Sequence, residues 1–324
     1  MFVPWGSNIA ELGEVSTVSR MPEKTPPPVC DYEGSDYQTR FWEKGGREYE
    51  DLCEAVAIKR LLPRHGKLLL ELGAGAGRNT LRYKSFDRII LLDYSRTQLK
   101  QAQALLGNSE RYVYVAADIY RLPFANGLFD AATMIRVLHH MADAPAALHQ
   151  IRNVLQPGGI FLLEFANKRN GKAILRYALH RQSWNPFSPE PVEFAPLNFD
   201  FHPKTLYHWL EELGFHIERT LTVSHFRIEL LKRSIPARIL AFLDSILQWS
   251  GALGQFTPSV FLRARAVGED IQQTPIGEVA SFFKCPECGH SPLITTDQQI
   301  NCPQCDRKWN IVDGIYDFRG DTPQ

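Results

Sequence analysis

Glu71-Leu-Gly-Ala-Gly-Ala-Gly77 lies between two apolar runs, one at residues 67–70 and one at 88–93. This order predicts a strand, a glycine turn, a short helix and a second strand. Nucleotide-like ligands bind at such turns because glycines let backbone N–H groups approach them. Arg78 stands where a pyrophosphate-binding G-x-G-x-x-G motif needs its last glycine. Glu71 suits a cationic ammonium or sulfonium better than a pyrophosphate.

From residue 67 onward, expected strands and helices alternate along the chain. Ser95 can cap the helix after the second strand, Gln98 completes a capping box, and Gly107 suits the end of that helix. The alternation predicts a parallel sheet with helices on both faces. The expected strands are 67–72, 88–93, 111–117, 129–137 and 160–165, and the expected helices are 95–107 and 144–155.

The regular alternation of strands and helices ends after the fifth strand. A helix at 205–213 and a strand at 215–223 are followed by an apolar stretch at 227–256, which predicts one or two helices, and by a last strand at 259–266. An amphipathic helix is expected earlier, at 48–62. The predicted organisation is a flexible tail at 1–36, a main domain at 37–266 with substrate-capping insertions at 168–200 and 227–256, a linker at 267–280 and a small domain at 281–324.

Composition narrows the class of protein. The 324 residues include 36 Lys+Arg and 36 Asp+Glu, so no global attraction to nucleic acid or membrane is implied. We find no signal peptide and no apolar run of membrane-spanning length. Four of the six cysteines form two C-x-x-C pairs, which indicates metal binding in a reducing compartment. A cytoplasmic protein is therefore expected, and its oligomeric state is left open.

Several motifs follow one another between residues 67 and 166. They are Glu71–Gly77, Leu92-Asp93-Tyr94-Ser95, Ala117-Asp118, Leu122-Pro123-Phe124, Phe129-Asp130 and Leu155-Gln156-Pro157-Gly158-Gly159. In this order they resemble the class I S-adenosylmethionine-dependent methyltransferases, specifically the type-eleven methyltransferase domain. The resemblance implies an α/β fold with a Rossmann-like doubly wound sheet of seven strands, in the order 3-2-1-4-5-7-6 with the last strand antiparallel. It also implies S-adenosylmethionine as cosubstrate.

The resemblance assigns a role to residues at both ends of this donor. Glu71 would support the glycine turn and balance the donor's amino group. Asp93 would accept both ribose hydroxyls, and Asp118 would take the adenine amino group. Tyr94 and Ile119 would pack on the base. The backbone that lies against the methionine moiety would come from Gly73, Ala74, Gly75 and Gly77.

His139 and His140, which follow the fourth strand, are candidates for a general base because histidine titrates near neutral pH. A base is needed only if the acceptor must lose a proton, since the sulfonium donor is already activated and alignment supplies much of the rate. Arg136 lies where donor and acceptor should meet. The structural alternatives are an ion pair for Arg136 and packing or capping for the histidines. His202 and His225 are weaker candidates.

The sequence says less about the methyl acceptor than about the methyl donor. Residues 135–138 lack the Asp/Asn-Pro-Pro-aromatic motif of enzymes that methylate nucleobase amines. The apolar stretch 227–256 predicts a cap packed on the core. The alternatives are that it lines an apolar acceptor pocket, which would suit a quinone- or lipid-like substrate, or lies on a membrane surface. We expect a small or lipid-like acceptor, methylated at oxygen or carbon. The basic stretch 168–181 leaves an RNA methyltransferase as an alternative. A non-catalytic, S-adenosylmethionine-binding regulatory or scaffold subunit is the third hypothesis.

The C-terminal piece carries a metal-binding pattern. Cys285-Pro-Glu-Cys288 and Cys302-Pro-Gln-Cys305 are separated by thirteen residues, and four thiolates at this spacing predict a structural Zn²⁺ with no open coordination position. Residues 311–318 resemble the end of the small zinc-ribbon activator protein that partners methyltransferases. Residues 281–324 hold four Lys/Arg and six Asp/Glu, which argues against RNA binding by this zinc ribbon.

Overall fold

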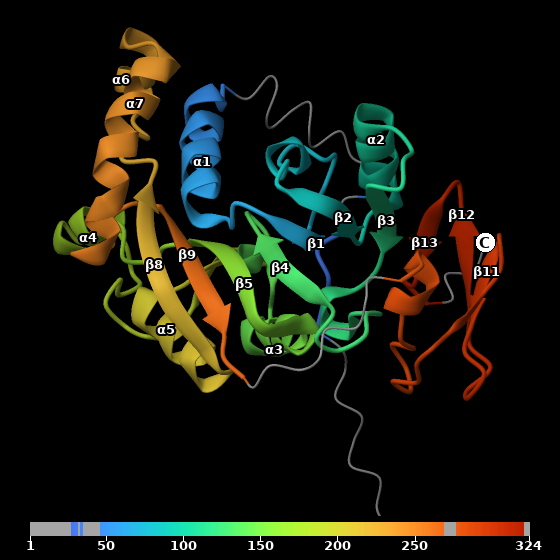
Figure 1. The fold of residues 1–324 in the computed structure, drawn as a ribbon. Coiled ribbons are helices and arrows are strands. Elements are labelled where there is room, and N and C mark those ends of the chain that lie inside the picture. The colour runs from blue at the N-terminus through green and yellow to red at the C-terminus, as the bar shows by residue number, and fades with distance from the viewer. Residues whose placement is uncertain (1–26, 32, 35–45, 269–276, 321–324) are drawn as a thin grey trace, which may run out of the picture.

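The computed structural model describes residues 27–31, 33–34, 46–268 and 277–320. Its centre is a mostly parallel sheet with helices on both faces (Figure 1). Seven strands of the main domain lie in the order β3-β2-β1-β4-β5-β9-β8, and β9 runs antiparallel to both neighbours, which confirms the expected topology. The strands are β1 Gly66–Leu72, β2 Phe86–Asp93, β3 Tyr112–Ala116, β4 Phe129–Met134, β5 Leu155–Ala166, β8 Phe215–Val223 and β9 Ser259–Ala266.

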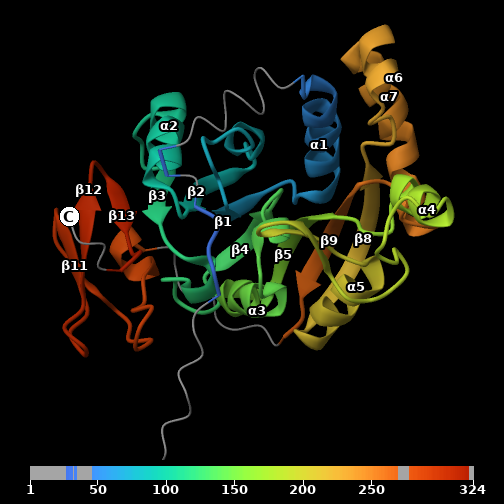
Figure 2. The same ribbon diagram turned by 180° about the vertical axis from the view of Figure 1, so that it is seen from behind.

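Consecutive leucines in β1 face opposite sides of the sheet. Leu68 and Leu70 pack in the cluster that includes α3 (Ala144–Val154) and α5 (Pro203–Glu212). Leu69 packs in the cluster that includes α1 (Glu48–Leu61) and α2 (Arg96–Leu106). The two views of the ribbon place these pairs of helices on opposite faces (Figures 1 and 2). Because both faces are covered, an unbroken apolar run forms the strand.

The start of α2 follows the expected capping box only in part. Ser95 Oγ accepts the Gln98 N–H at 3.3 Å, and Gly107 ends the helix with a φ of 77°. The backbone N–H of Ser95, however, donates to Asp93 Oδ1 at 2.9 Å. The second half of the box is therefore replaced by a bond that orients the Asp93 carboxylate.

The two insertions gather at one end of the sheet. Residues 168–200 form α4 (Gly171–Ala178), β6 (Val192–Ala195) and β7 (Asn198–Asp200), whereas 227–256 form α6 (Glu229–Ser234), α7 (Ala237–Leu247) and the 3-10 helix η5 (Gln248–Ala252). One side of α7 packs beside α1, where Tyr49 Oη donates to Asp244 at 2.8 Å. Within the described ranges, no helix is long and apolar enough to cross a membrane. The other 3-10 helices are η2 Thr80–Arg82, η3 Ile119–Arg121, η4 Leu138–His140 and η6 Val279–Phe282.

The C-terminal piece extends the sheet of the main domain. Its strands are β10 Ile294–Thr295, β11 Gln299–Asn301, β12 Lys308–Val312 and β13 Ile315–Asp317. β13 pairs in parallel with β3, so one continuous sheet of 11 strands runs through both parts. The pairing covers the β3 edge, which would otherwise expose unpaired backbone groups. This contact was not predicted from the sequence, since a strand of three residues gives little pattern.

Packed aromatic rings also join the C-terminal piece to the main domain. Phe283 forms an isolated antiparallel bridge with Phe124 of the main domain, and their rings stack at 5.9 Å. The Phe283 ring also lies 5.0 Å from both Tyr316 and Phe318. Both Phe124 and Phe283 are fully buried, so the ribbon shares the hydrophobic core of the main domain.

Candidate active site and cysteine cluster

Two hollows meet at the carboxyl ends of β1, β2 and β4. Gly73, Gly75 and Gln98 line both of them. One extends toward Glu71 and Arg136, and the other toward the ends of β2 and β3. In an open α/β sheet, ligands bind at this edge, where strand order switches between the two sides of β1.

The glycine turn adopts a backbone that favours glycine. The φ angles of Gly73, Gly75 and Gly77 are 64°, 54° and 79°. A Cβ on Gly73 would lie 2.2 Å from Val137 Cγ2, whereas a Cβ on Gly75 would meet only Gln98 Oε1, at 3.9 Å. Gly75 therefore leaves its backbone open to the hollow, and a ligand can lie directly against it.

Asp93 joins the turn to the next strand. Its Oδ2 accepts the Gly75 N–H at 2.8 Å, and its Oδ1 accepts the Ser95 N–H at 2.9 Å. Burial, with smaller contributions from the charges of Asp31 and Glu33, raises the pKa of Asp93 to about 6 in spite of these bonds. A carboxylate fixed in this way still has acceptor capacity on both oxygens, so it fits a pair of hydroxyl donors.

The residues that were expected to bind the adenine end of the donor line the second hollow together. Tyr94, Asp118 and Ile119 do so with Met141 and His140. Asp118 Oδ1 also accepts the Tyr120 N–H at 2.9 Å, so this aspartate caps the short helix η3 as well. Burial raises the pKa of Asp118.

Glu71 lies in the first hollow, beside Ala74. Its carboxyl accepts the Thr80 hydroxyl at 2.5 Å, and burial raises its pKa to about 7. Glu71 shares the first hollow with Arg78 and Arg136, whereas Asp93 and Asp118 give the second hollow an acidic lining. Such a lining favours a ligand that carries positive charge.

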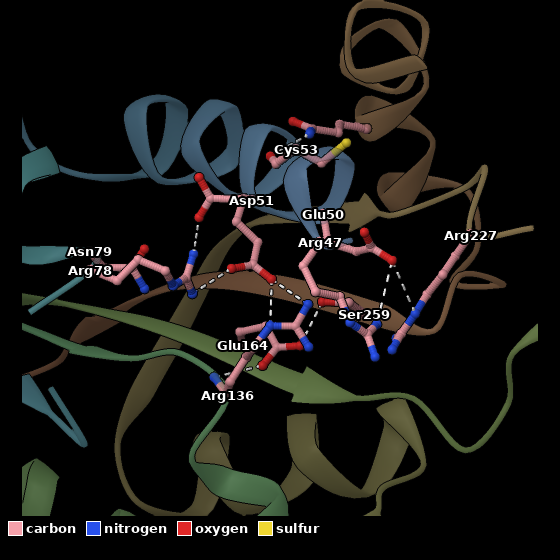
Figure 3. A network of polar contacts seen from close by, with 12 residues as sticks. Arg47, Glu50, Asp51, Cys53, Arg78, Asn79, Arg136, Glu164, Arg227 and Ser259 are labelled. Atoms are coloured by element: carbon pink, nitrogen blue, oxygen red, sulfur yellow. Dashed lines mark hydrogen bonds and ion pairs between the residues drawn. The ribbon is translucent and has the colours of Figure 1, made fainter. Parts of the chain in front are cut away.

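Arg136 forms an ion pair, which is the structural alternative named above. Its guanidinium contacts Glu54 of α1, and its backbone, at a φ of 58°, donates N–H to Glu164 Oε2 at 2.9 Å. Arg78 bonds the same Glu54 at 2.9 Å. Burial would raise the pKa of Glu54, but Arg136 and Arg78 outweigh it and lower the pKa. Figure 3 shows this network between α1 and the ends of β4 and β5.

The sequence reasoning missed Glu54 and Glu164. Both are buried acids, Glu54 in α1 and Glu164 in β5. The available signal was charge inside an otherwise apolar pattern, since a carboxylate is rarely buried without a partner. Arg136 also lines the first hollow, so the network reaches the site.

His139 and His140 lie on η4 with their rings 4.0 Å apart. His140 Nδ1 donates to the Leu197 carbonyl at 2.9 Å, and its ring lines the second hollow. Burial lowers the pKa of His139 well below its usual value, with smaller contributions from His140 and Arg136, and burial also lowers that of His140. Both imidazoles are therefore neutral at pH 7 and weaker bases than a free imidazole, and His139 lines neither hollow.

The weaker histidine candidates have structural partners. His202 Nδ1 caps α5 by accepting the Lys204 N–H at 3.3 Å. His225 Nδ1 lies 2.9 Å from Asp244 Oδ2 and faces a separate cavity of about 400 Å³. Neither lines the two hollows at the glycine turn.

Part of the predicted tail contacts the site. Val29 and Cys30 line the second hollow. Glu33 accepts N–H bonds from Arg96 at 2.9 Å and Thr97 at 3.1 Å, so it caps the start of α2. This described part of 1–36 is thus anchored, unlike the flexible tail expected from its prolines; residues 1–26, 32 and 35–36 lie outside the described residues.

The ribbon also reaches the second hollow. Arg319 donates to the Tyr94 carbonyl at 3.1 Å, and its guanidinium lies 5.7 Å from the centre of the Tyr94 ring. The same side chain pairs with Asp317 at 2.8 Å and with Glu33 at 3.2 Å. Arg319 thus connects the ribbon, the N-terminal segment and the turn after Asp93.

The four C-terminal cysteines converge. Their sulfur atoms all lie within 4.8 Å of one another, with Cys285–Cys305 at 3.6 Å and Cys288–Cys302 at 3.5 Å. Tetrahedral zinc with Zn–S bonds of about 2.3 Å requires S···S separations of about 3.8 Å. The donor set and its spacing therefore fit the predicted zinc.

Comparison with known proteins identifies the family. The sequence profile described as "Methyltransferase domain" matches residues 70–163. An uncharacterized chloroplastic methyltransferase of Arabidopsis thaliana is 37% identical over 140 residues, which cover 40% of this chain and 39% of the relative. The demethylmenaquinone methyltransferase of Mycolicibacterium gilvum is 32% identical over 177 residues, which cover 54% of this chain and 71% of the relative.

A solved structure shares the fold. One chain of the complex between the Haloferax volcanii Trm112 methyltransferase activator and a methyltransferase aligns with a TM-score of 0.51 and 16% identity, over 72% of this chain and 96% of the other. At this identity the likeness concerns the fold alone. The profile match and the Mycolicibacterium gilvum relative carry the assignment: the chain belongs to the class I S-adenosylmethionine-dependent methyltransferases.

Proposed function

We propose that this enzyme methylates a small, lipid-like acceptor of the quinone type, at oxygen or carbon. The donor half of the proposal depends on one observation above all, the Asp93 carboxylate held by the Gly75 and Ser95 N–H groups at the edge of an acidic hollow. The acceptor half is supported by the relative that is named for demethylmenaquinone.

In this proposal the chain binds the donor along both hollows. Asp93 accepts the ribose hydroxyls, Asp118 the adenine amino group, and Tyr94 and Ile119 flank the base. The backbone from Gly73 to Gly77 and the Glu71 carboxyl hold the methionine end. When bound, S-adenosylmethionine supplies a methyl group that needs no further activation.

The acceptor would meet the donor beside Arg136 and the two neutral histidines. Arg136 is fixed by Glu54 and Glu164, so it gives this region a defined positive group. A quinol hydroxyl there can lose its proton to a neutral imidazole during transfer, and alignment supplies most of the remaining rate.

The RNA alternative is weakened by where the basic side chains lie. Lys168 is buried and donates to Ser188 and to the Glu190 carbonyl at 2.6 Å, and Lys172 donates to the Arg227 carbonyl at 2.6 Å. Arg169 lies over the Phe256 ring at 5.2 Å. Much of the stretch 168–181 therefore supports the local structure rather than forming a row of free cations for phosphates.

A label-transfer assay tests the acceptor. We expect the purified chain to move radiolabelled methyl from S-adenosylmethionine to a reduced demethylmenaquinone, recovered in the organic phase, and not to total RNA. Label in RNA would contradict the proposal. Tight donor binding with no labelled product from cell extracts would favour the scaffold hypothesis instead.

Asp93→Ala should weaken S-adenosylmethionine binding at least about 100-fold, because two hydrogen bonds to a carboxylate contribute about 1.5–3 kcal/mol each. Calorimetry on the purified variant measures this. Asp87→Asn, at the exposed opposite end of the same strand, is the control and should bind normally.

The same site predicts a pH dependence. With a pKa of about 6, Asp93 is ionised at pH 7 and becomes protonated as the pH falls toward 5, so wild-type donor affinity should fall over that range. The same fall in affinity between pH 7 and 5 in Asp93→Ala would assign the titration to another acid of the site, such as Glu71.

His139→Ala combined with His140→Ala should lower kcat about 100-fold for an acceptor that must lose a proton. Loss of His139 should change donor affinity little. The single variant His140→Ala measures how much the His140 side chain, which lines the second hollow, contributes to donor affinity. Stopped-flow or steady-state transfer assays measure this, with His149→Ala on the exposed side of α3 as control. Full turnover by the double variant would show that no imidazole base is used.

We further propose that the ribbon binds one structural Zn²⁺ and supports donor binding through Arg319. The four cysteines hold the ribbon together, and Arg319 holds the Asp93–Tyr94 turn from that ribbon. The ribbon would thus act within one chain as part of the donor site.

Two variants distinguish the effect of losing zinc from the effect of losing the contact between Arg319 and Tyr94. Cys285→Ser should lose zinc by elemental analysis and weaken donor affinity, whereas Arg319→Ala should keep zinc and raise the donor KM about 10-fold with little change in kcat. Lys308→Ala, exposed on β12, is the matched control. Wild-type donor affinity in Arg319→Ala would disprove the contact's role, and a folded, zinc-free wild-type chain would disprove the metal.

A further inference from the structure

α7 is apolar on both of its sides. Leu240 and Ala241 are buried on the side that packs beside α1. The opposite side carries a stripe at positions i, i+3, i+4, i+7 and i+8, where a water-facing helix places polar residues. The stripe consists of Ile239, Phe242, Leu243, Ile246 and Leu247, which are between 40% and 65% exposed.

Neighbouring elements extend this surface. After α7, Trp249, Leu253 and Phe256 are exposed, and Leu253 reaches 95%. Leu175 and Leu179, near the end of α4, are 60% and 53% exposed. α4 is joined to the same region because the Gly171 N–H donates to the Phe256 carbonyl at 2.8 Å. Figures 1 and 2 both show α4, α6 and α7 at one end of the molecule. We call the five residues of the α7 stripe and these five exposed neighbours, Trp249, Leu253, Phe256, Leu175 and Leu179, the apolar end surface.

The charges around the apolar end surface are mostly positive. Apart from Lys172, which donates to the Arg227 carbonyl, the exposed basic residues of α4, α6, α7 and the turn after α4 are Arg176, Arg181, Arg233 and Arg238. Glu229 is the exposed acid of the described segments 171–181 and 227–256, and it pairs with Arg233 at 3.0 Å. A chain with no net charge therefore concentrates cations beside its exposed apolar side chains.

We propose that the apolar end surface binds a membrane rich in anionic lipids. Apolar side chains of α7 and η5 would enter the boundary between headgroups and acyl chains, and the basic residues would contact the headgroups. Trp249 suits that depth, since its exposed ring has the guanidinium groups of Arg60 and Arg219 at 5.3 Å and 5.8 Å from its centre.

The charges around the apolar end surface favour an anionic membrane over a second copy of the chain as its binding partner. A symmetric contact between two such surfaces would bring basic residues against basic residues, which costs free energy. An anionic bilayer instead complements both the apolar stripe and the cations.

The surface also borders a cavity. The cavity of about 400 Å³ lies between α4, α6 and η5, and Arg227, Phe256 and Ser224 line it. Arg227 pairs with Glu50 at 3.6 Å, at the far side of the network in Figure 3. A docked membrane would therefore face a cavity able to take up part of a lipid-like acceptor; this last step rests on the proposed function, whereas membrane binding does not.

Co-sedimentation of the full chain with vesicles tests the proposal without any methyl donor. Binding to phosphatidylglycerol-containing vesicles should exceed binding to pure phosphatidylcholine at least 10-fold and should weaken as salt rises. The variant Phe242→Ser, Ile246→Ser and Leu253→Ser should lose at least 10-fold of that binding. The control is Leu81→Ser, Leu105→Ser and Ile294→Ser, at comparably exposed positions outside the apolar end surface, and it should bind like wild type.

Three outcomes would overturn the proposal. The first is equal sedimentation with and without vesicles, and the second is an equal loss of binding in the control variant. The third is a wild-type dimer, seen by light scattering, that the triple variant converts to monomer without any vesicle binding, because the surface would then join two copies. Arg176→Glu with Arg238→Glu should remove the preference for anionic lipid while circular dichroism stays unchanged.

Discussion

The Asp93 carboxylate is the interaction on which the site depends, because it ties the turn after β1 to the helix after β2. Each of its oxygens accepts one backbone N–H, from Gly75 and from Ser95. These bonds require a left-handed Gly75 and a helix that begins at Ser95, so the glycine and the cap serve the same carboxylate. The hollow is therefore shaped before any ligand arrives.

This arrangement has an energetic cost that a ligand can relieve. Burial raises the pKa of Asp93 from 3.8 to about 6, which corresponds to about 3 kcal/mol against the ionised form. Since the folded-state pKa is raised, the ligand-free protein is favoured below the unfolded value and loses that stability as the pH rises through 6. Hydroxyl donors and a cationic ligand offset the cost at neutral pH.

A second set of buried charges fixes α1 against the sheet. Glu54 is held by Arg136 and Arg78, and Glu164 accepts the Arg136 N–H and the Ser259 hydroxyl at 2.6 Å. Buried ion pairs contribute geometry more reliably than stability, because desolvation cancels much of their attraction. Here they hold Arg136 in a left-handed conformation at the edge of the first hollow.

The sequence predicted what local pattern encodes. Apolar runs bounded by Gly, Asp and Ser placed the strands of the main domain, and the spacing of Cys285, Cys288, Cys302 and Cys305 brought four thiols together as expected. Contacts between distant segments were not predictable in this way. Glu54 meets Arg136 across 82 positions, and Tyr94 meets Arg319 across 225, and neither pairing leaves a periodic trace.

The seven-stranded part of the sheet is extended or flanked by an added segment at each of its two ends. At the β3 end the ribbon contributes Arg319 to the turn that holds Asp93 and Tyr94. At the β8 end the insertion after that strand contributes Arg227 to Glu50, in the network that includes Arg136. Arg319 and Arg227 contact different residues, the first beside Asp93 and the second at Glu50, so a substitution in one addition leaves the contacts of the other in place. The proposed division, in which the ribbon affects donor affinity and the insertion affects acceptor choice, depends on that separation.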